Sequence, residues 1–234
     1  MKILALDTAT ENCSAALIIN GAYFEREQLL GRGAAEAILP LIRELLTGAA
    51  VALRDLDAIA FGRGPGGFTG VRLAASVTQG LAFGAGLRVV PVSNLQALAQ
   101  RILSAEPKTV RVLAALDARM GEVYFGAFER THAGLAVAAG PECVVAPEQV
   151  SLPKTWFSPP AAVGAGSGFD AYPQLKAALA GHLGAVRERL LPRAREIAQL
   201  AMADVKAGRL LGPEGAVPVY LRDNVAQPRA MPKS

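Results

Sequence analysis

The residues that could carry chemistry in this chain lie in a glycine-rich stretch and at the end of the first predicted strand. The stretch AFGRGPGGFTGVRLAAS at residues 60–76 lies between a strand-like segment and a helix-like one. A glycine loop that opens a helix presents free backbone N–H groups, which favour an anion such as phosphate. Alternatively, the glycines turn the chain sharply and let the next helix pack closely. Phosphate binding and close packing are the two interpretations of this loop.

Two known phosphate motifs each fail in this loop at a decisive position. Gly62, Gly64 and Gly67 have the spacing of the dinucleotide fingerprint, which also needs an acidic residue about 20 residues later. No acidic residue follows the loop before Glu106. Gly62 and Gly67 are also spaced as in a P-loop, but Phe68 replaces the lysine that neutralises the phosphates. Only a weaker anion contact through the backbone of the loop remains.

Asp7 is the second candidate, because it ends the first predicted strand and precedes Thr8-Ala9-Thr10. An acid with hydroxyls at such a turn is how actin-like phosphotransferases hold Mg²⁺ and phosphate. A two-lobed enzyme of that class needs a second acidic turn, for which Asp117 is the candidate. The alternative is an ordinary turn in which Asp7 bonds its own backbone. The candidate nucleotide or anion contacts are Asp7, Thr8, Gly64, Gly66, Gly67, Thr69 and Asp117.

The sequence lacks the patterns of a metal site or a catalytic triad. His132 and His182 are the only histidines, and neither H-x-x-x-H nor C-x-x-C occurs. A metal site normally needs several such ligands at fixed spacing. A triad would need one of the two histidines, and neither is flanked by a catalytic signature. We therefore expect no metal site and no catalytic residue, and we assign both histidines to turns or the surface.

Length and composition indicate a globular, cytoplasmic protein without membrane contact. The 234 residues are 52% hydrophobic and 19% charged, enough for one large domain or two lobes. No stretch reaches the ~20 apolar residues needed to span a bilayer, and the run before Asp7 is too short for a signal peptide. Cys13 and Cys143 give no disulfide framework. The net charge of +4 permits contact with nucleic acid, but the basic residues are scattered.

Alternating strands and helices must position these residues. The predicted elements are strands at 2–6, 13–19, 22–29, 57–61, 88–92, 110–116 and 122–128 and helices at 35–46, 71–84, 94–103 and 193–207. Asn20-Gly21 predicts a hairpin, and Pro40 predicts a kink or a late start of helix 35–46. Asn94 is expected to cap helix 94–103. The order β-β-β-α-β-α-β-α matches one lobe of a ribonuclease-H-like fold.

A hinge at Glu106-Pro107-Lys108 divides the chain into a lobe at residues 1–105 and a smaller lobe at residues 106–234. Proline and glycine dominate the second lobe up to about Gly168, which predicts loops and short strands. The polar tail at 217–234 is expected to run over the surface.

The helix after the glycine loop is uncharged from Leu73 to Leu87 and rich in small residues. Such a helix is buried on several sides, in the core or in a protein interface, and helix 35–46 is its natural neighbour. The predicted interface, with a partner protein or with a second copy of the chain, is formed by Ile38, Leu41, Ile42, Leu45, Ala74, Val77, Thr78 and Leu81.

Four motifs together resemble the bacterial TsaB (YeaZ) family. They are DTAT at 7–10, GRGPGGFTGVR at 62–72, LDARMGEVY at 116–124 and YLRDNVA at 220–226. The resemblance implies an α/β, two-lobed ribonuclease-H-like and actin-like (ASKHA) fold with a truncated second lobe. It also implies a role in making threonylcarbamoyladenosine at position 37, beside the anticodon of tRNAs that read codons beginning with adenine. One departure is Gly67, where the family pattern has serine.

The resemblance further implies two protein partners. TsaD is a related protein that holds a metal with an H-x-x-x-H pair and transfers threonylcarbamoyl from its adenylate to adenosine, and TsaE is an ATPase that binds at the junction. This chain has no histidine before His132, so helix 35–46 lacks the metal pair. The chain is therefore expected to be a subunit that has no activity alone, binds no cofactor independently, shares ATP or ADP at the complex interface, and meets tRNA indirectly.

Two enzymatic functions are the alternatives to a non-catalytic subunit. An independent ATP-dependent phosphotransferase of the actin and sugar-kinase superfamily would use Asp7, Thr8 and Asp117. A metallopeptidase, a class to which relatives of this fold have been assigned, is disfavoured because the metal pair is missing.

Overall fold

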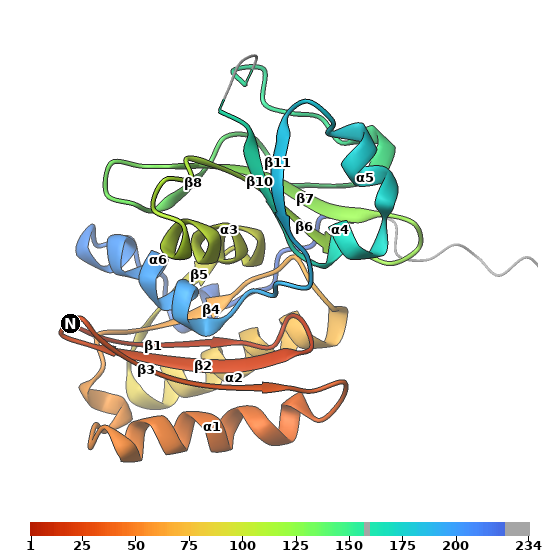
Figure 1. The fold of residues 1–234 in the computed structure, drawn as a ribbon. Helices are drawn as coiled ribbons and strands as arrows, with labels where there is room; N and C mark the ends of the chain where they lie inside the picture. Colours follow the sequence, from red (N-terminus) through yellow and green to blue (C-terminus); the bar gives the residue numbers. More distant parts are fainter. Residues whose placement is uncertain (157–159, 223–234) are drawn as a thin grey trace, which may run out of the picture.

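The computed structural model describes residues 1–156 and 160–222 and contains two β-sheets with helices on and between them (Figure 1). The first sheet has the order β3-β2-β1-β4-β5. Its strands are β1 Lys2–Asp7, β2 Asn12–Ile19, β3 Ala22–Leu29, β4 Ala58–Gly62 and β5 Arg88–Val92. Strands β1, β2 and β3 pair antiparallel, and β4 and β5 continue the sheet parallel to β1.

The second sheet repeats this topology. Its order is β11-β10-β6-β7-β8, with β9 also paired to β7. Its strands are β6 Arg111–Asp117, β7 Val123–Arg130, β8 Ala136–Ala138, β9 Cys143–Val145, β10 Ala162–Ala165 and β11 Leu183–Arg187. Strands β6, β7 and β8 are antiparallel, and β10 and β11 are parallel to β6. Since β6 takes the place of β1, the two lobes share one α/β plan, which confirms the two-lobed ribonuclease-H-like prediction.

The helices form three layers around the sheets (Figure 1). They are α1 Ala34–Gly48, α2 Phe68–Ala85, α3 Asn94–Ala105, α4 Ser167–Ala171, α5 Pro173–Ala178 and α6 Ala194–Lys206. Helices α1 and α2 cover the outer face of the first sheet, while α3 and α6 lie between the sheets, α6 against the first and α3 against the second. On the second lobe α4 and α5 are only five and six residues long, so this lobe is reduced.

The central strands are apolar at successive positions because both faces of the first sheet are covered. Ile3 and Ala5 of β1 face the core between the sheets, whereas Leu4 and Leu6 face α1 and α2. Side chains alternate between the two faces of a strand, so a strand covered on both faces reads as a continuous apolar run. This double burial fixes β1 and places its last residue, Asp7, at the edge where β4 also ends.

The chain after the second sheet returns to the first lobe. Helix α6 packs on strands of the first sheet, and Leu211 pairs with Val89 of β5. Further along, the backbone N–H of Val219 donates to the carbonyl of Arg63, 2.7 Å away. The C-terminal segment therefore contacts the glycine loop of the first lobe. The domain boundary between residues 105 and 106 stays a prediction.

Several details of the predicted elements are corrected. Helix α1 begins at Ala34, before Pro40, so the late start is wrong; proline is tolerated there although its ring removes one helical hydrogen bond. The Asn20-Gly21 hairpin is confirmed, with φ of 49° and 92° at these residues. The strand β11 and the short helices α4 and α5 were not predicted. The part of the predicted tail at 223–234 lies outside the described residues. Within the described residues, no helix is long and apolar enough to cross a membrane.

Candidate functional site

Asp7 lies at the end of β1 and is completely buried. Its Oδ1 accepts hydrogen bonds from the backbone N–H of Ala9 at 3.1 Å and from Nδ2 of Asn94 at 2.8 Å, while its Oδ2 has no partner among the described residues. Burial raises the pKa of Asp7 from 3.8 to about 6, and the hydrogen bonds offset only part of that effect. A carboxylate that holds Mg²⁺ must reach the ion, and this one has no exposed surface.

The glycine loop packs directly on the turn after Asp7. The backbone N–H of Gly67 donates to the carbonyl of Ala9 at 2.7 Å, and the hydroxyl of Thr8 donates to the carbonyl of Gly70 at 2.7 Å. A Cβ at Gly70 would lie 2.0 Å from the Thr8 carbonyl oxygen, and one at Gly66 would lie 2.5 Å from that of Ala9. These glycines are therefore needed for close approach of two backbones, which favours packing over phosphate binding.

Asn94 joins the loop to Asp7, and its predicted role as a helix cap is wrong. Ser93 is the N-cap of α3, because its hydroxyl accepts from the N–H of Gln96 at 3.2 Å. The fully buried Asn94 side chain instead accepts from the N–H of Gly64 at 2.8 Å and donates to Asp7. Asparagine has both a donor and an acceptor, so it satisfies both neighbours. The sequence pattern could not reveal this contact because asparagine is also a common cap.

A carboxylate of the second lobe reaches the same loop, which the sequence did not indicate. Glu142 precedes β9 and accepts a short hydrogen bond from the Ser93 hydroxyl; its other oxygen lies 3.9 Å from Nη2 of Arg63. Burial raises the pKa of Glu142, while Ser93 and Arg63 act in the opposite direction. Glu142 therefore ties the second lobe to the glycine loop.

Asp117 is held by its own turn at the end of β6. Its Oδ1 accepts from the backbone N–H of Arg119 and from the hydroxyl of Tyr172, both at 2.8 Å, and its Oδ2 pairs with the Arg119 guanidinium at 3.1 Å. Glu122, on the other side of this turn, pairs with Arg222. Asp7 and Asp117 are thus each engaged by a separate turn on a separate sheet.

The predicted interface helices α1 and α2 lie on the same face of the first sheet, and most of the predicted interface side chains face inward. The buried ones are Ile38, Leu41, Ile42, Leu45, Ala74 and Thr78, each at most 3% exposed. Only Val77 and Leu81 are partly exposed. The 3.6-residue period identifies the apolar face of a helix, and here that face meets the chain's own sheet. A partner interface formed by these residues stays a prediction.

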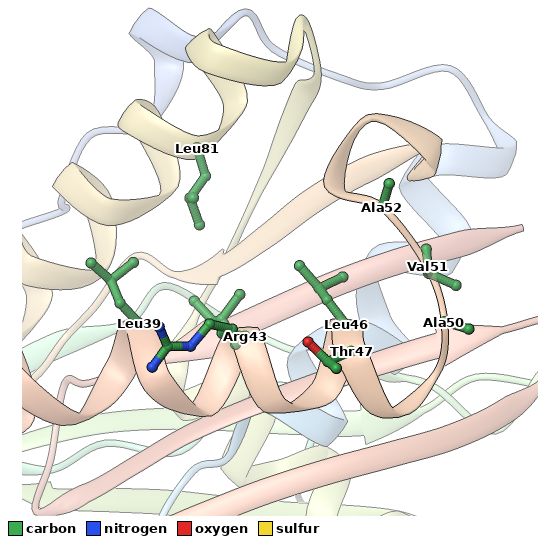
Figure 2. Close-up of a pocket in the computed structure, with 9 residues that line it drawn as sticks. Leu39, Arg43, Leu46, Thr47, Ala50, Val51, Ala52 and Leu81 are labelled. Atoms are coloured by element: carbon green, nitrogen blue, oxygen red, sulfur yellow. The ribbon is translucent and has the colours of Figure 1, made fainter.

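The outer surface of α1 and α2 instead carries an open groove of about 500 Å³. Figure 2 shows Leu39, Arg43 and Leu46 of α1 along one side and Leu81 of α2 facing them. Leu39 is 50% exposed there. Large apolar side chains gathered at an open groove are typical of a protein interaction site.

Two glycines of α2 give a matched test of the packing interpretation. We expect Gly70→Ala to destabilise the chain by about 2 kcal/mol or more, because its Cβ would overlap the Thr8 carbonyl. Gly80→Ala in the same helix should stabilise it by about 0.5–1 kcal/mol, since nothing lies within 4 Å of that Cβ and alanine favours helix. Urea unfolding of both variants measures the difference. Equal effects of the two substitutions would contradict close packing at Gly70.

Comparison with known proteins identifies close relatives of this chain. A family model described as TsaD, tRNA N6-adenosine threonylcarbamoyltransferase, matches residues 28–230. The tRNA threonylcarbamoyladenosine biosynthesis protein TsaB of Escherichia coli is 41% identical over 231 residues, which cover 97% of this chain and 96% of that protein. TsaB of Haemophilus influenzae is 50% identical over 125 residues, 53% of this chain and 52% of that protein. The solved structure of YeaZ from Pseudomonas aeruginosa is 42% identical with a TM-score of 0.87, covering 94% of this chain and 99% of that one.

Proposed function

The chain belongs to the TsaB (YeaZ) family of tRNA threonylcarbamoyladenosine biosynthesis proteins, and we infer from this that it is a non-catalytic subunit in making that nucleoside. The modified adenosine is position 37, beside the anticodon of tRNAs that read codons beginning with adenine. The chain activates a metal-bearing TsaD-like paralogue together with a TsaE-like ATPase, in the cytoplasm. The observation that carries the non-catalytic role is the complete burial of Asp7 beneath the glycine loop.

The burial of Asp7 matters because the fold is that of phosphotransferases. In such an enzyme the acid after the first strand must meet Mg²⁺ and phosphate. Here Gly66 and Gly70 bring the loop into contact with the backbone of residues 8–9, so the space beside Asp7 is filled by protein. The residues present do not fit an Mg²⁺-bound phosphate at Asp7. An independent phosphotransferase is therefore disfavoured.

ATP or ADP at the interface of the complex is part of the same proposal. Gly67 and Thr69 are exposed residues of the glycine loop, although the N–H of Gly67 is already bonded to the Ala9 carbonyl. Helix α2 starts at Phe68 and has no acidic residue in its first turn, so an anion held by a partner meets no repulsion there. The chain alone would bind no nucleotide, and the assembled complex would share it.

The groove between α1 and α2 is the surface that we assign to the paralogue. Leu39 and Leu46 present apolar surface, and Arg43 at the rim supplies charge. The same surface supports self-association of the isolated chain, because burying it removes apolar area from water in either case. Reconstitution of tRNA modification with the paralogue and the ATPase, with this chain present or omitted, tests the proposal. Modification that proceeds equally without the chain would refute it.

A further inference from the structure

Three exposed side chains form a cluster at the N-terminal end of α2 that no part of the proposed function uses. Phe68 and Arg72 are one helical turn apart, and Tyr220 comes from the C-terminal segment. The guanidinium carbon of Arg72 lies 3.6 Å from the centroid of the Phe68 ring, and Nε of Arg72 donates to the Tyr220 hydroxyl at 2.6 Å. The two ring centroids are 5.9 Å apart. We call Phe68, Arg72 and Tyr220 the aromatic platform.

The backbone on both sides of the platform is fixed by the glycine loop. Val219 donates its N–H to the Arg63 carbonyl at 2.7 Å, and a Cβ on Gly64 would lie only 2.8 Å from the Val219 carbonyl oxygen. Tyr220 is therefore held against the start of α2 before any ligand arrives. Nevertheless, Phe68 remains 51% exposed and Tyr220 44% exposed. The platform is preformed and open to solvent, which lowers the entropic cost of binding a flat ligand.

Arg72 gives the platform an uncompensated positive charge. Within the described part of the chain, the two arginines nearest in the loop and tail pair with acids, Arg63 with Glu142 and Arg222 with Glu122. The contacts described for Arg72 are instead the Tyr220 hydroxyl and the two aromatic rings. A guanidinium with no carboxylate partner attracts a phosphate, while aromatic faces stack on nucleobases.

We propose that the aromatic platform binds single-stranded RNA, with an unpaired base stacked on Phe68 or Tyr220 and its phosphate on Arg72. This inference rests on the proposed function, in which the substrate is a tRNA modified in its loop. Aromatic residues and arginine are also enriched at protein interfaces, so a protein partner is the competing occupant of this surface. RNA is favoured because the contacts described for Arg72 include no carboxylate, and a phosphate would supply the missing negative charge. RNA supplies both the flat rings and the negative charge.

The test measures RNA binding by the full chain assembled with its TsaD-like partner. The probes are a labelled RNA hairpin with a single-stranded loop and a fully paired duplex of equal length. Phe68→Leu keeps the apolar volume but removes the aromatic face, and it should weaken hairpin binding about tenfold. Arg72→Gln should also weaken hairpin binding about tenfold, and the slope of log affinity against log salt concentration should fall by about the value of one phosphate contact. Duplex binding should change less than hairpin binding for Phe68→Leu.

Matched variants separate stacking from general charge and from misfolding. Arg88→Gln removes one exposed positive charge at the start of β5, the opposite end of the parallel strands, and should change affinity by less than about twofold. Phe68→Trp should retain hairpin binding. The fluorescence of the introduced indole should fall when hairpin RNA binds but not with duplex RNA, while the signal of the buried Trp156 stays constant. All variants are checked for unchanged melting temperature, which is expected because the substituted side chains are exposed.

Three results would overturn the proposal. Platform variants that bind the hairpin as tightly as the wild type would exclude stacking. Variants that lose the TsaD-like partner but not RNA would show the platform to be a protein contact. A wild-type complex that requires the chain for modification yet binds hairpin and duplex equally would refute the platform while leaving the proposed function standing.

Discussion

Asp7→Asn is expected to stabilise the isolated chain above pH 6, by about 1–3 kcal/mol. The wild-type protein must ionise a carboxyl group that is fully buried and has one oxygen without a partner among the described residues. Asparagine keeps an oxygen for the N–H of Ala9 and the amide of Asn94 and never ionises. A substitution at the acid of an actin-like motif should therefore make the protein more stable.

The pH dependence of unfolding follows from the pKa of Asp7, which burial raises from 3.8 to about 6. Between these two values the unfolded chain is ionised at Asp7 while the folded chain is protonated, so the contribution of Asp7 to stability rises as the pH falls. Above pH 6 the folded chain is ionised as well and the full penalty of burial applies. Below about pH 4 both states are protonated, and the advantage of Asp7→Asn should vanish.

Urea unfolding of the wild type and Asp7→Asn from pH 4 to pH 8 measures this difference. Glu142, whose pKa is also raised, titrates in both proteins, so it cancels in the comparison. A variant that is less stable than the wild type at pH 8 would show that the charged form of Asp7 is favoured in the fold. Asp7 would then be an ionised carboxylate, as the phosphotransferase alternative requires.

Leu39→Lys is expected to abolish binding of the TsaD-like paralogue, with at least about a hundredfold loss of affinity, and to leave the fold intact. Leu39 is half exposed at the groove between α1 and α2, so a lysine there reaches water in the free chain. In the complex the same ammonium group would be buried against apolar surface without a partner. Size-exclusion chromatography and titration calorimetry with the paralogue measure the loss.

Val137→Lys provides the matched control for Leu39→Lys. Val137 is similarly exposed, at 46%, but lies on β8 of the second lobe. It should bind the paralogue as the wild type does. Equal binding by Leu39→Lys and Val137→Lys would exclude the groove as the interface. The buried Ala74 is unsuitable for this test, because a charge there would disrupt the core of the chain itself.

The strands and long helices were predictable because their apolar periods and turn residues act locally. Asn20-Gly21 fixes the β2–β3 hairpin, and the apolar period of residues 35–46 identifies α1. The repeat of one sheet topology in both lobes could not be detected as a sequence repeat. Short elements such as α4 depend on packing against the second sheet and carry too little local signal.

The site was predicted in part, and the missing part consists of contacts distant in sequence. Asp7, Thr8 and the glycines do come together, as their positions after β1 and β4 indicated. However, Asn94 reaches Asp7 from 87 residues further along the chain, and Glu142 reaches the loop from the second lobe. Nothing in the local sequence distinguishes Asn94 from a helix cap or Glu142 from an ordinary loop acid. The same limit applies to Leu39, because periodicity identifies the buried face of a helix and not which exposed residues meet a partner.

We propose that this chain supplies a folded surface, and no catalytic carboxylate, to tRNA threonylcarbamoylation. The direct measurement is the rate of modification by the reconstituted TsaD-like paralogue and ATPase with wild-type chain, with Asp7→Asn, and with no chain. We expect no modification without the chain and the same rate with Asp7→Asn as with the wild type. Loss of modification with a folded, complex-forming Asp7→Asn would contradict it and make Asp7 a catalytic group.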